Sequence, residues 1–282
     1  MTWFWWALVY VGLVSGFYYL SKKLLNQKEV DPRIFGGLMN LGVGIIAFPV
    51  AWWQGFVFEW SWSSVGMLML LGLVITVAAS LYYEGLKRVD LSESNVLESS
   101  SAIWVMFLGF LIFGEDLSRY KILAVLMVMA SVWLISGMGR KLRLGKYELM
   151  ILVSAIFYAI GSILDKYFVG ISTPVSYLCI GFLTVGVFLT VVNLPRWKEK
   201  RAMFSFGFVK KLAVICLFIS VGYGALLYAY KMGEVSRVGT VIQTQVGVVG
   251  LMGIIFLKER KNLGRKLVAL VMMLTGLYLI RI

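Results

Sequence analysis

The 282-residue chain is 60% hydrophobic and 15% charged, against roughly 45–50% and about 25% in soluble globular domains. Its mean hydropathy is +0.87, so a water-soluble fold would leave apolar surface that it could not cover. The formal net charge is +13. Because the basic residues stand between apolar runs, this charge indicates membrane topology and not nucleic-acid binding. The composition is that of an integral membrane protein.

Ten apolar runs follow one another, each close to the roughly 20 residues that a helix needs to cross a bilayer. The first run has no basic segment before it and no cleavage site after it, so we expect a retained helix and not a signal peptide. The continuous runs differ from the alternating segments of outer-membrane barrels. The sequence predicts an all-α bundle of ten transmembrane helices: Thr2–Leu20, Ile34–Trp53, Val65–Tyr83, Leu91–Phe113, Ile122–Met138, Leu149–Phe168, Pro174–Leu194, Leu212–Tyr230, Val238–Leu257 and Leu267–Ile280.

Residue types exclude several classes of chemistry. Histidine is absent, which removes the usual general base at neutral pH and the commonest metal ligand. The two cysteines, Cys179 and Cys216, lie inside apolar runs, so neither a disulfide framework nor a thiolate cluster is expected. A Walker-type loop is also absent, so ATP is not the direct energy source. We expect no enzyme, no cofactor and no bound metal.

Lysine and arginine are distributed unequally over the two sides of the predicted bundle. The odd-numbered connections hold 21 of them, and the even-numbered connections with the C-terminus hold 6. By the positive-inside rule the odd connections are cytoplasmic and both termini lie outside.

The two halves of the chain resemble each other. A shift of 144 residues superposes Lys22 on Lys166, Ser92 on Ser236 and Glu115 on Glu259. Because each half holds five helices, equivalent helices cross the membrane in opposite directions, as in the inverted repeats of secondary transporters. We expect a first five-helix repeat over residues 1–138, a basic connecting loop over 139–146 and a second repeat over 147–282.

Ten spans in two halves, with an apolar helix that ends in Phe113-Gly114-Glu115 before the fifth span, resemble the drug/metabolite transporter superfamily and its EamA-type ten-helix members. The second half departs from this pattern, since Lys258 stands where Gly is usual. The resemblance covers the whole chain. It implies cytoplasmic termini, opposite to the charge count. We expect a multi-pass protein of the cytoplasmic (inner) membrane of a prokaryote.

Polar side chains within the spans are the site candidates, because they are costly in hydrocarbon. Helical spacing in the fourth run places Ser94, Glu98 and Ser101 on one face. Glu98 is the deepest acidic residue of any run, about 10 Å inside. It is either a structural group, bonded by serines or by Lys87, or a cation-binding or proton-titrating carboxylate. Glu84, at the end of the third run, is expected beside it.

The ninth run is the counterpart of the fourth and offers Gln243 and Gln245. These amides suit either a polar metabolite or helix packing. Trp104 and Tyr83 are the aromatic candidates nearest Glu98, and rings beside a carboxylate hold organic amines by cation–π contact.

These features predict a secondary transporter that moves a small polar or cationic metabolite, such as an amino acid or an amine, by alternating access. Its partners would be the lipid bilayer, the substrate, and a coupling proton or counter-substrate. One alternative, implied by the resemblance, is an organophosphate or nucleotide-sugar exchanger, with basic clamps at Lys22, Lys87, Lys166 and Lys231. The other alternative is a membrane channel.

Overall fold

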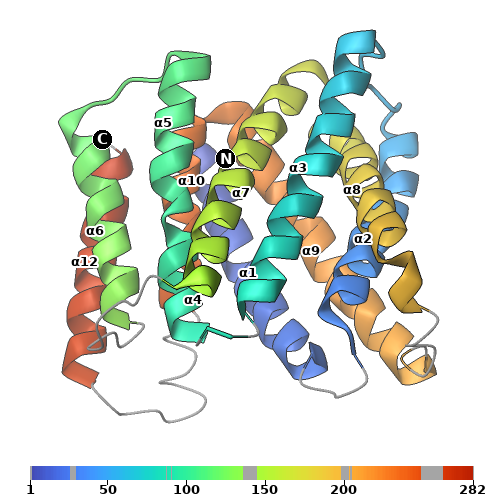
Figure 1. Cartoon of the computed structure of the whole chain (residues 1–282). Coiled ribbons are helices and arrows are strands. Elements are labelled where there is room, and N and C mark those ends of the chain that lie inside the picture. Colours follow the sequence, from blue (N-terminus) through green and yellow to red (C-terminus); the bar gives the residue numbers. More distant parts are fainter. Residues whose placement is uncertain are drawn as a thin grey trace.

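The computed structural model describes residues 2–25, 30–86, 88–89, 91–135, 145–197, 203, 205–248 and 263–281. In these residues the pairing outside helices is an isolated bridge between Phe58 and Ser172. The helices form one bundle (Figure 1). They are α1 (Trp3–Leu25), α2 (Pro32–Trp53), α3 (Trp62–Leu86), α4 (Leu91–Ser99), α5 (Ser101–Phe113), α6 (Arg119–Ile135), α7 (Lys146–Ile171), α8 (Pro174–Trp197), α9 (Phe206–Met232), α10 (Val235–Ile242) and α12 (Leu263–Arg281).

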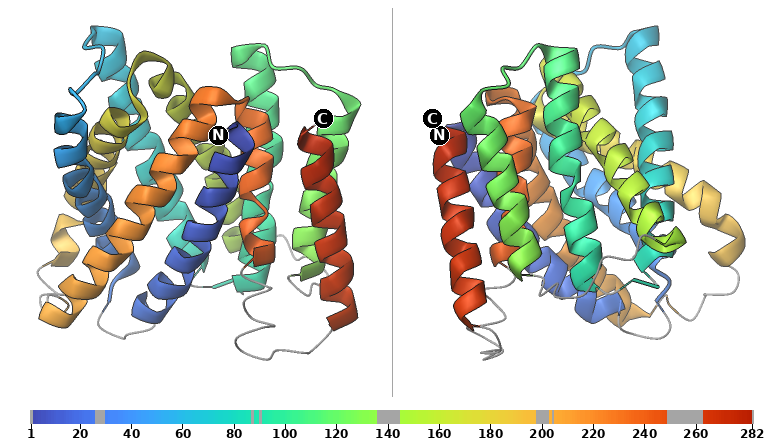
Figure 2. Two further views of the ribbon diagram at one scale, coloured as in Figure 1. Left: turned by 180° about the vertical axis from the view of Figure 1, so that it is seen from behind. Right: turned by 60° about the vertical axis from the view of Figure 1, so that its left-hand side comes forward.

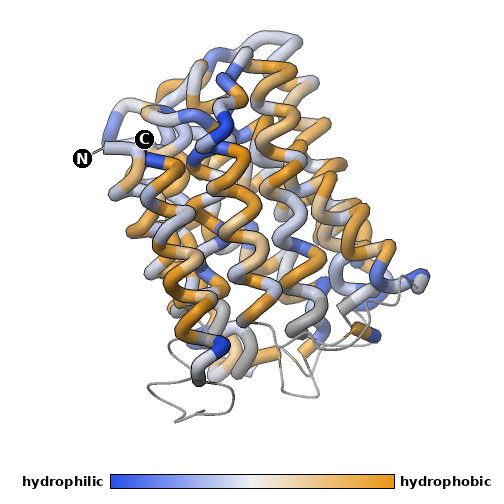
Figure 3. Tube along the Cα trace, turned by 90° about the vertical axis from the view of Figure 1, so that its left-hand side faces the viewer, coloured by the Kyte–Doolittle hydropathy of each residue, from blue (hydrophilic) through white to orange (hydrophobic). Residues whose placement is uncertain are grey.

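The length and composition of these helices are those of a membrane protein. Hydrophobic residues dominate the middle of the bundle, and hydrophilic residues gather toward its ends (Figure 3). Shorter apolar helices cover Trp3–Phe17 and Leu267–Arg281. Six stretches of the described residues are long and apolar enough to cross a bilayer: Pro32–Trp53, Trp62–Gly85, Val96–Phe113, Lys146–Ile171, Pro174–Arg196 and Phe206–Met232. The chain is an all-helical, multi-pass integral membrane protein.

The two ends of the bundle carry different connections. The first and last described helices bring the N- and C-termini to the same end, the upper end in Figures 1 and 2. The links from α2 to α3, α5 to α6, α7 to α8 and α9 to α10 lie at this end too. The carboxyl ends of α1, α3, α6 and α8 lie at the opposite end (Figure 1), and in the sequence most of the lysine and arginine falls in the connections that follow the predicted helices on this side. This separation is the one on which the charge count depends.

The fourth apolar run, which we expected to be one continuous helix, is interrupted. Helix α4 ends at Ser99 and α5 begins at Ser101. The Ser99 and Ser100 hydroxyls donate to the carbonyls three residues earlier, at 2.7 and 2.6 Å, and such bonds compete with the helical pattern. Ser94 and Glu98 therefore lie on α4, whereas Ser101 begins the next helix. Ser100 between the two helices keeps helical backbone angles, with φ −59° and ψ −20°.

The ninth run is interrupted at the equivalent place. Helix α10 ends at Ile242, Gln243 and Thr244 form a turn, and the chain is helical again from Gln245 to Val248. The Thr244 hydroxyl donates to the Val241 carbonyl at 2.7 Å. The turns at Ser100 and Thr244 are separated by the same 144 residues that relate the two halves of the sequence.

Several helices extend beyond the apolar runs because capping groups lie in the polar flanks. Helix α9 begins six residues before Leu212, where the Ser205 hydroxyl accepts from the Phe208 amide at 3.2 Å. Helix α7 begins at Lys146 and not at Leu149. The ends of the fifth and ninth runs, Met138 and Leu257, and most of the connecting loop at 139–146 fall outside the described residues.

Helix contacts follow a regular scheme. The most extensive are those of α2 with α8, α1 with α9, α6 with α12 and α3 with α7. At the α2–α8 contact a Cβ on Gly186 would lie 2.7 Å from the Leu41 amide nitrogen, and one on Gly37 would lie 2.9 Å from Thr190 Oγ1. Glycine thus permits these two backbones to approach closely, as is common between membrane helices.

Candidate functional site

The two interrupted segments meet each other. Gln243 Nε2 donates a hydrogen bond to Ser101 Oγ at 3.0 Å. A Cβ on Gly239 would lie 2.9 Å from Val105 Cγ1, so α10 also packs closely on α5. Two residues after Gln243, the buried Gln245 Oε1 has no hydrogen-bond donor among the described residues. The crossing therefore concentrates polar groups between two broken helices.

Glu98 lies two residues before the first interruption, among tyrosine rings. It is partly buried and accepts a hydrogen bond from the Tyr82 side chain. The Tyr82 ring centroid lies 5.8 Å from that of Tyr83 and 6.3 Å from that of Tyr158. Tyr83 and Tyr158 both interact electrostatically with Glu98. We call Glu98, Tyr82, Tyr83 and Tyr158 the Glu98 cluster.

The other residues singled out from the sequence lie in different settings. Ser94 is fully buried on α4, and Ser101 is 8% exposed at the crossing. Glu84 forms an ion pair with Arg33, with Oε2 and Nη2 2.6 Å apart. Trp104 is 37% exposed and points out from α5. We therefore leave Glu84 and Trp104 out of the candidate site. Lys87, an expected partner of Glu98, lies outside the described residues.

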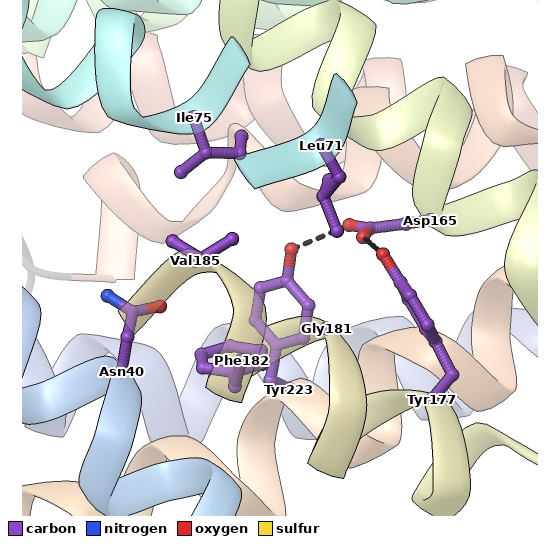
Figure 4. Close-up of a pocket in the computed structure, with 9 residues that line it drawn as sticks. All are labelled: Asn40, Leu71, Ile75, Asp165, Tyr177, Gly181, Phe182, Val185 and Tyr223. Carbon is purple, nitrogen blue, oxygen red and sulfur yellow. Dashed lines mark hydrogen bonds between the residues drawn. The ribbon is translucent and has the colours of Figure 1, made fainter. Parts of the chain in front are cut away.

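A second buried carboxylate, Asp165, was missed by the sequence analysis. It is 5% exposed, and two tyrosine hydroxyls from different helices donate to its two oxygens. Tyr177 of α8 reaches Oδ1 at 2.5 Å, and Tyr223 of α9 reaches Oδ2 at 2.6 Å (Figure 4). An acidic residue three positions before the end of the sixth apolar run, Leu149–Phe168, was the available signal.

Asp165 borders a cavity of about 50 Å³. The cavity can hold water but is far below the roughly 300 Å³ or more of a metabolite site. Its lining is Asn40, Leu71, Ile75, Asp165, Tyr177, Gly181, Phe182, Val185 and Tyr223.

Basic side chains pair elsewhere in the described part of the chain. The ion pairs there are Arg33–Glu84, Lys121–Glu234, Arg237–Glu234 and Arg196–Asp31. Neither Glu98 nor Asp165 takes part in them. Within the described residues, both carboxylates are therefore held by tyrosines and not by a protein cation.

The lysines considered as phosphate clamps have structural partners where they are described. Lys166 Nζ donates to the Tyr230 and Gly233 carbonyls at 2.5 and 2.7 Å, and Lys231 Nζ donates to the Ser172 carbonyl at 3.4 Å. Lys166 thus caps the carboxyl end of α9, where cations are favourable. The side chains of Lys22 and Lys87 lie outside the described part.

The Gly114-Glu115 turn has a defined structural role. Gly114 has a φ of +65°, a left-handed conformation that favours glycine. Glu115 is 7% exposed and accepts from the amides of Val235 and Ser236 at 2.5 and 3.0 Å, and from the Ser236 hydroxyl. A carboxylate at the first turn of α10 satisfies free amides and complements the helix dipole. The turn therefore joins the two halves of the chain.

A family model places this arrangement among known proteins. The model of the EamA-like transporter family matches residues 1–137 and 145–282. The chain belongs to the EamA-like transporter family. The family resemblance carried by Phe113-Gly114-Glu115 is thus confirmed. Membership indicates a transporter of small molecules across a membrane and points away from an enzyme.

A curated protein and a solved structure are also similar to this chain. An uncharacterized transporter of Archaeoglobus fulgidus is 25% identical over 206 residues, which cover 67% of this chain and 68% of that protein. A solved crystal structure shares the fold with a TM-score of 0.78, over 98% of this chain and 95% of the other. Its sequence identity is 15%, so this likeness concerns the fold alone.

Proposed function

We propose that this EamA-like transporter is a secondary carrier of a small cationic or polar metabolite, of the amino acid or amine type. The observation that carries the proposal is the Glu98 cluster. A carboxylate attracts an ammonium group, and a tyrosine ring contributes about 0.5–2 kcal/mol by cation–π contact. Because no ion pair of the described residues includes Glu98, a cationic substrate is a suitable charge complement.

The proposed substrate contacts come from both halves of the chain. Glu98 and Ser94 lie on α4, Tyr83 lies on α3, and Ser101 is tied to Gln243 across the crossing. Gln245 Oε1, which has no hydrogen-bond donor in the part of the chain that the structure describes, adds an acceptor. These groups suit an ammonium at Glu98 and further polar atoms of the substrate toward Gln243.

The architecture we propose is ten spans arranged as two inverted repeats, 1–138 and 147–282. The helix contacts support it, because exchanging the halves turns the α1–α9 contact into the α3–α7 contact. The same exchange turns the α4–α7 contact into the α1–α10 contact, and it maps the α2–α8 and α6–α12 contacts onto themselves. The family model also matches two stretches of nearly equal length.

Alternating access follows from this architecture. Inverted repeats can expose a central site first to one side and then to the other. The broken helices at Ser100 and Thr244 offer places where such a movement can be absorbed.

Two measurements test the carrier proposal. Purified protein is screened by thermal shift against L-lysine, putrescine, L-alanine and glucose 6-phosphate, because a ligand of the folded state raises the melting temperature. We expect L-lysine or putrescine to raise it most. The radiolabelled compound is then used for counterflow in proteoliposomes, which a carrier supports and a channel does not. A response to glucose 6-phosphate alone would favour the phosphate exchanger, and flux without counterflow would favour the channel.

A further inference from the structure

We infer that the Asp165 cavity is a proton-binding site, separate from the Glu98 cluster, and that it couples proton movement to transport. The coupling role rests on the proposed carrier function, whereas the proton site itself does not. The cavity lining includes no member of the Glu98 cluster. The two carboxylates thus belong to two sites, and Tyr10 of α1 interacts electrostatically with both.

The polar groups of the cavity are arranged to accept hydrogen. Each tyrosine hydroxyl can donate one hydrogen bond, and Tyr177 and Tyr223 both donate theirs to Asp165. Asn40 Nδ2 donates to the Gly36 carbonyl at 2.8 Å, which leaves Asn40 Oδ1 as an acceptor. An incoming species that supplies hydrogen or positive charge therefore finds acceptors at Asp165 and at Asn40 Oδ1.

The size and lining of the cavity favour a proton over a metal ion. Its volume of about 50 Å³ accommodates one or two water molecules. Hard cations such as Ca²⁺ and Mg²⁺ take six or more oxygen ligands. Side-chain oxygens come only from Asn40, Asp165, Tyr177 and Tyr223, and the other lining residues are apolar or glycine. A proton needs only the carboxylate and a water that delivers it.

Among the described residues, the charged and titratable neighbours of Asp165 leave its charge unbalanced. Tyr10 approaches from α1, Tyr177 from α8, and Tyr223 and Tyr230 from α9. Helices α2 and α3 supply Asn40, Leu71 and Ile75. The neighbouring Lys166 is bound to carbonyls of α9. A buried carboxylate without a cation is costly, and a proton removes that charge.

Protonation would also change the contacts between three helices. The ionised carboxylate accepts one tyrosine from α8 and one from α9, so it ties both helices to α7. A hydronium in the cavity gives its proton to one carboxylate oxygen and leaves as water. That oxygen then carries a hydrogen and loses its role as the stronger acceptor, so one tyrosine contact weakens. Release of the proton to water restores both contacts. Such a change can bias helix movement.

Infrared difference spectroscopy on the full-length protein in proteoliposomes tests the proton site without a substrate. The pH is stepped between about 5 and 8, the range in which protein pH switches commonly titrate. We expect a protonated-carboxyl band to rise on acidification, to be lost in Asp165→Asn and to persist in Glu98→Gln. An unchanged spectrum in Asp165→Asn would overturn the proposal. Loss of the band on adding Na⁺ at constant pH would overturn it in favour of a metal site.

Tyrosine variants keep the test informative if Asp165→Asn does not fold. Tyr177→Phe and Tyr223→Phe each remove one hydrogen bond that favours the charged carboxylate. The midpoint of the infrared titration should therefore move to higher pH in each. Tyr167→Phe, a change on the same helix as Asp165 and outside the cavity lining, should leave the midpoint in place. Equal midpoints in all three variants would contradict the assignment.

The coupling role has its own readout. If counterflow shows a carrier, an imposed pH gradient should accelerate uptake of the labelled compound by the wild type and not by Asp165→Asn. Equal acceleration in both would separate proton binding at Asp165 from transport. If counterflow fails altogether, the infrared result still decides the proton site.

Discussion

Gln243 Nε2 lies 3.0 Å from Ser101 Oγ, and this hydrogen bond joins the two broken helices from opposite halves of the chain. Hydrogen bonds between membrane helices contribute about 0.6 kcal/mol on average. We expect Gln243→Leu to lower the melting temperature only slightly and to reduce counterflow markedly, because the amide is also a proposed substrate contact. Thr275→Val is the matched control, since it removes an exposed hydrogen bond from the Thr275 hydroxyl to a carbonyl of the same helix, α12. Equal counterflow in both variants would remove Gln243 from the site.

Glu115 should be a strong determinant of stability. Glu115→Ala leaves the Val235 and Ser236 amides without their acceptor, and a buried unsatisfied group costs about 1–3 kcal/mol. Thermal unfolding in detergent should show a clear decrease for this variant. Asp116→Ala, an exposed neighbour, should change the free energy of unfolding by no more than about 0.5 kcal/mol. Similar decreases in both variants would contradict the capping role.

Glu234 predicts a specific dependence of stability on pH. Burial acts to raise the pKa of this carboxyl, but hydrogen bonds from Lys121 and Arg237 and their charges outweigh burial and hold the pKa below its ordinary value. A lowered pKa in the folded state stabilises the protein above the ordinary value, about 4.3, and this contribution is lost as the pH falls through the folded pKa.

The matching experiment compares melting temperatures of the wild type and Glu234→Gln from neutral pH down to about pH 3. We expect the wild type to be more stable at neutral pH, where Lys121 has its 2.8 Å partner. The two curves should converge on acidification. A constant difference at every pH would show that the carboxylate charge is not responsible.

Orientation is open to a direct chemical test. Cys179 and Cys216 are buried, so single cysteines can be introduced at exposed Ser63, Gly170 and Gly145. If the charge count gives the orientation, an impermeant maleimide added outside labels the first two positions and not Gly145→Cys. The reverse pattern would support cytoplasmic termini, as the family resemblance implies.

Continuous apolar runs predict most of the helices, because a helix needs a long apolar stretch to cross a bilayer. It does not reveal helix ends set by polar caps such as Ser205. It also misses the interruptions, because the deciding bonds of Ser99, Ser100 and Thr244 are local competitions between side chain and backbone.

The candidate site was only partly predictable for a different reason. Glu98 and Gln243 stand out as polar residues in apolar runs, and the crossing brings Gln243 to Ser101. Asp165 becomes notable only when α8 and α9 place Tyr177 and Tyr223 against it. Trp104 is close to Glu98 in sequence, yet it lies on the exposed side of α5. Proximity along a chain does not specify the direction of a side chain.

The Glu98 charge is the proposed binding group for the substrate. The most direct test of this role is the rate of counterflow in proteoliposomes that contain Glu98→Gln. The radiolabelled compound is L-lysine or putrescine, whichever raises the melting temperature. Glu59→Gln is the control, because Glu59 is exposed in the connection between α2 and α3. Loss of a charged contact worth about 1.5–3 kcal/mol predicts that Glu98→Gln lowers the rate of counterflow at least about tenfold. Glu59→Gln should show the wild-type rate. Wild-type counterflow in Glu98→Gln would contradict the account.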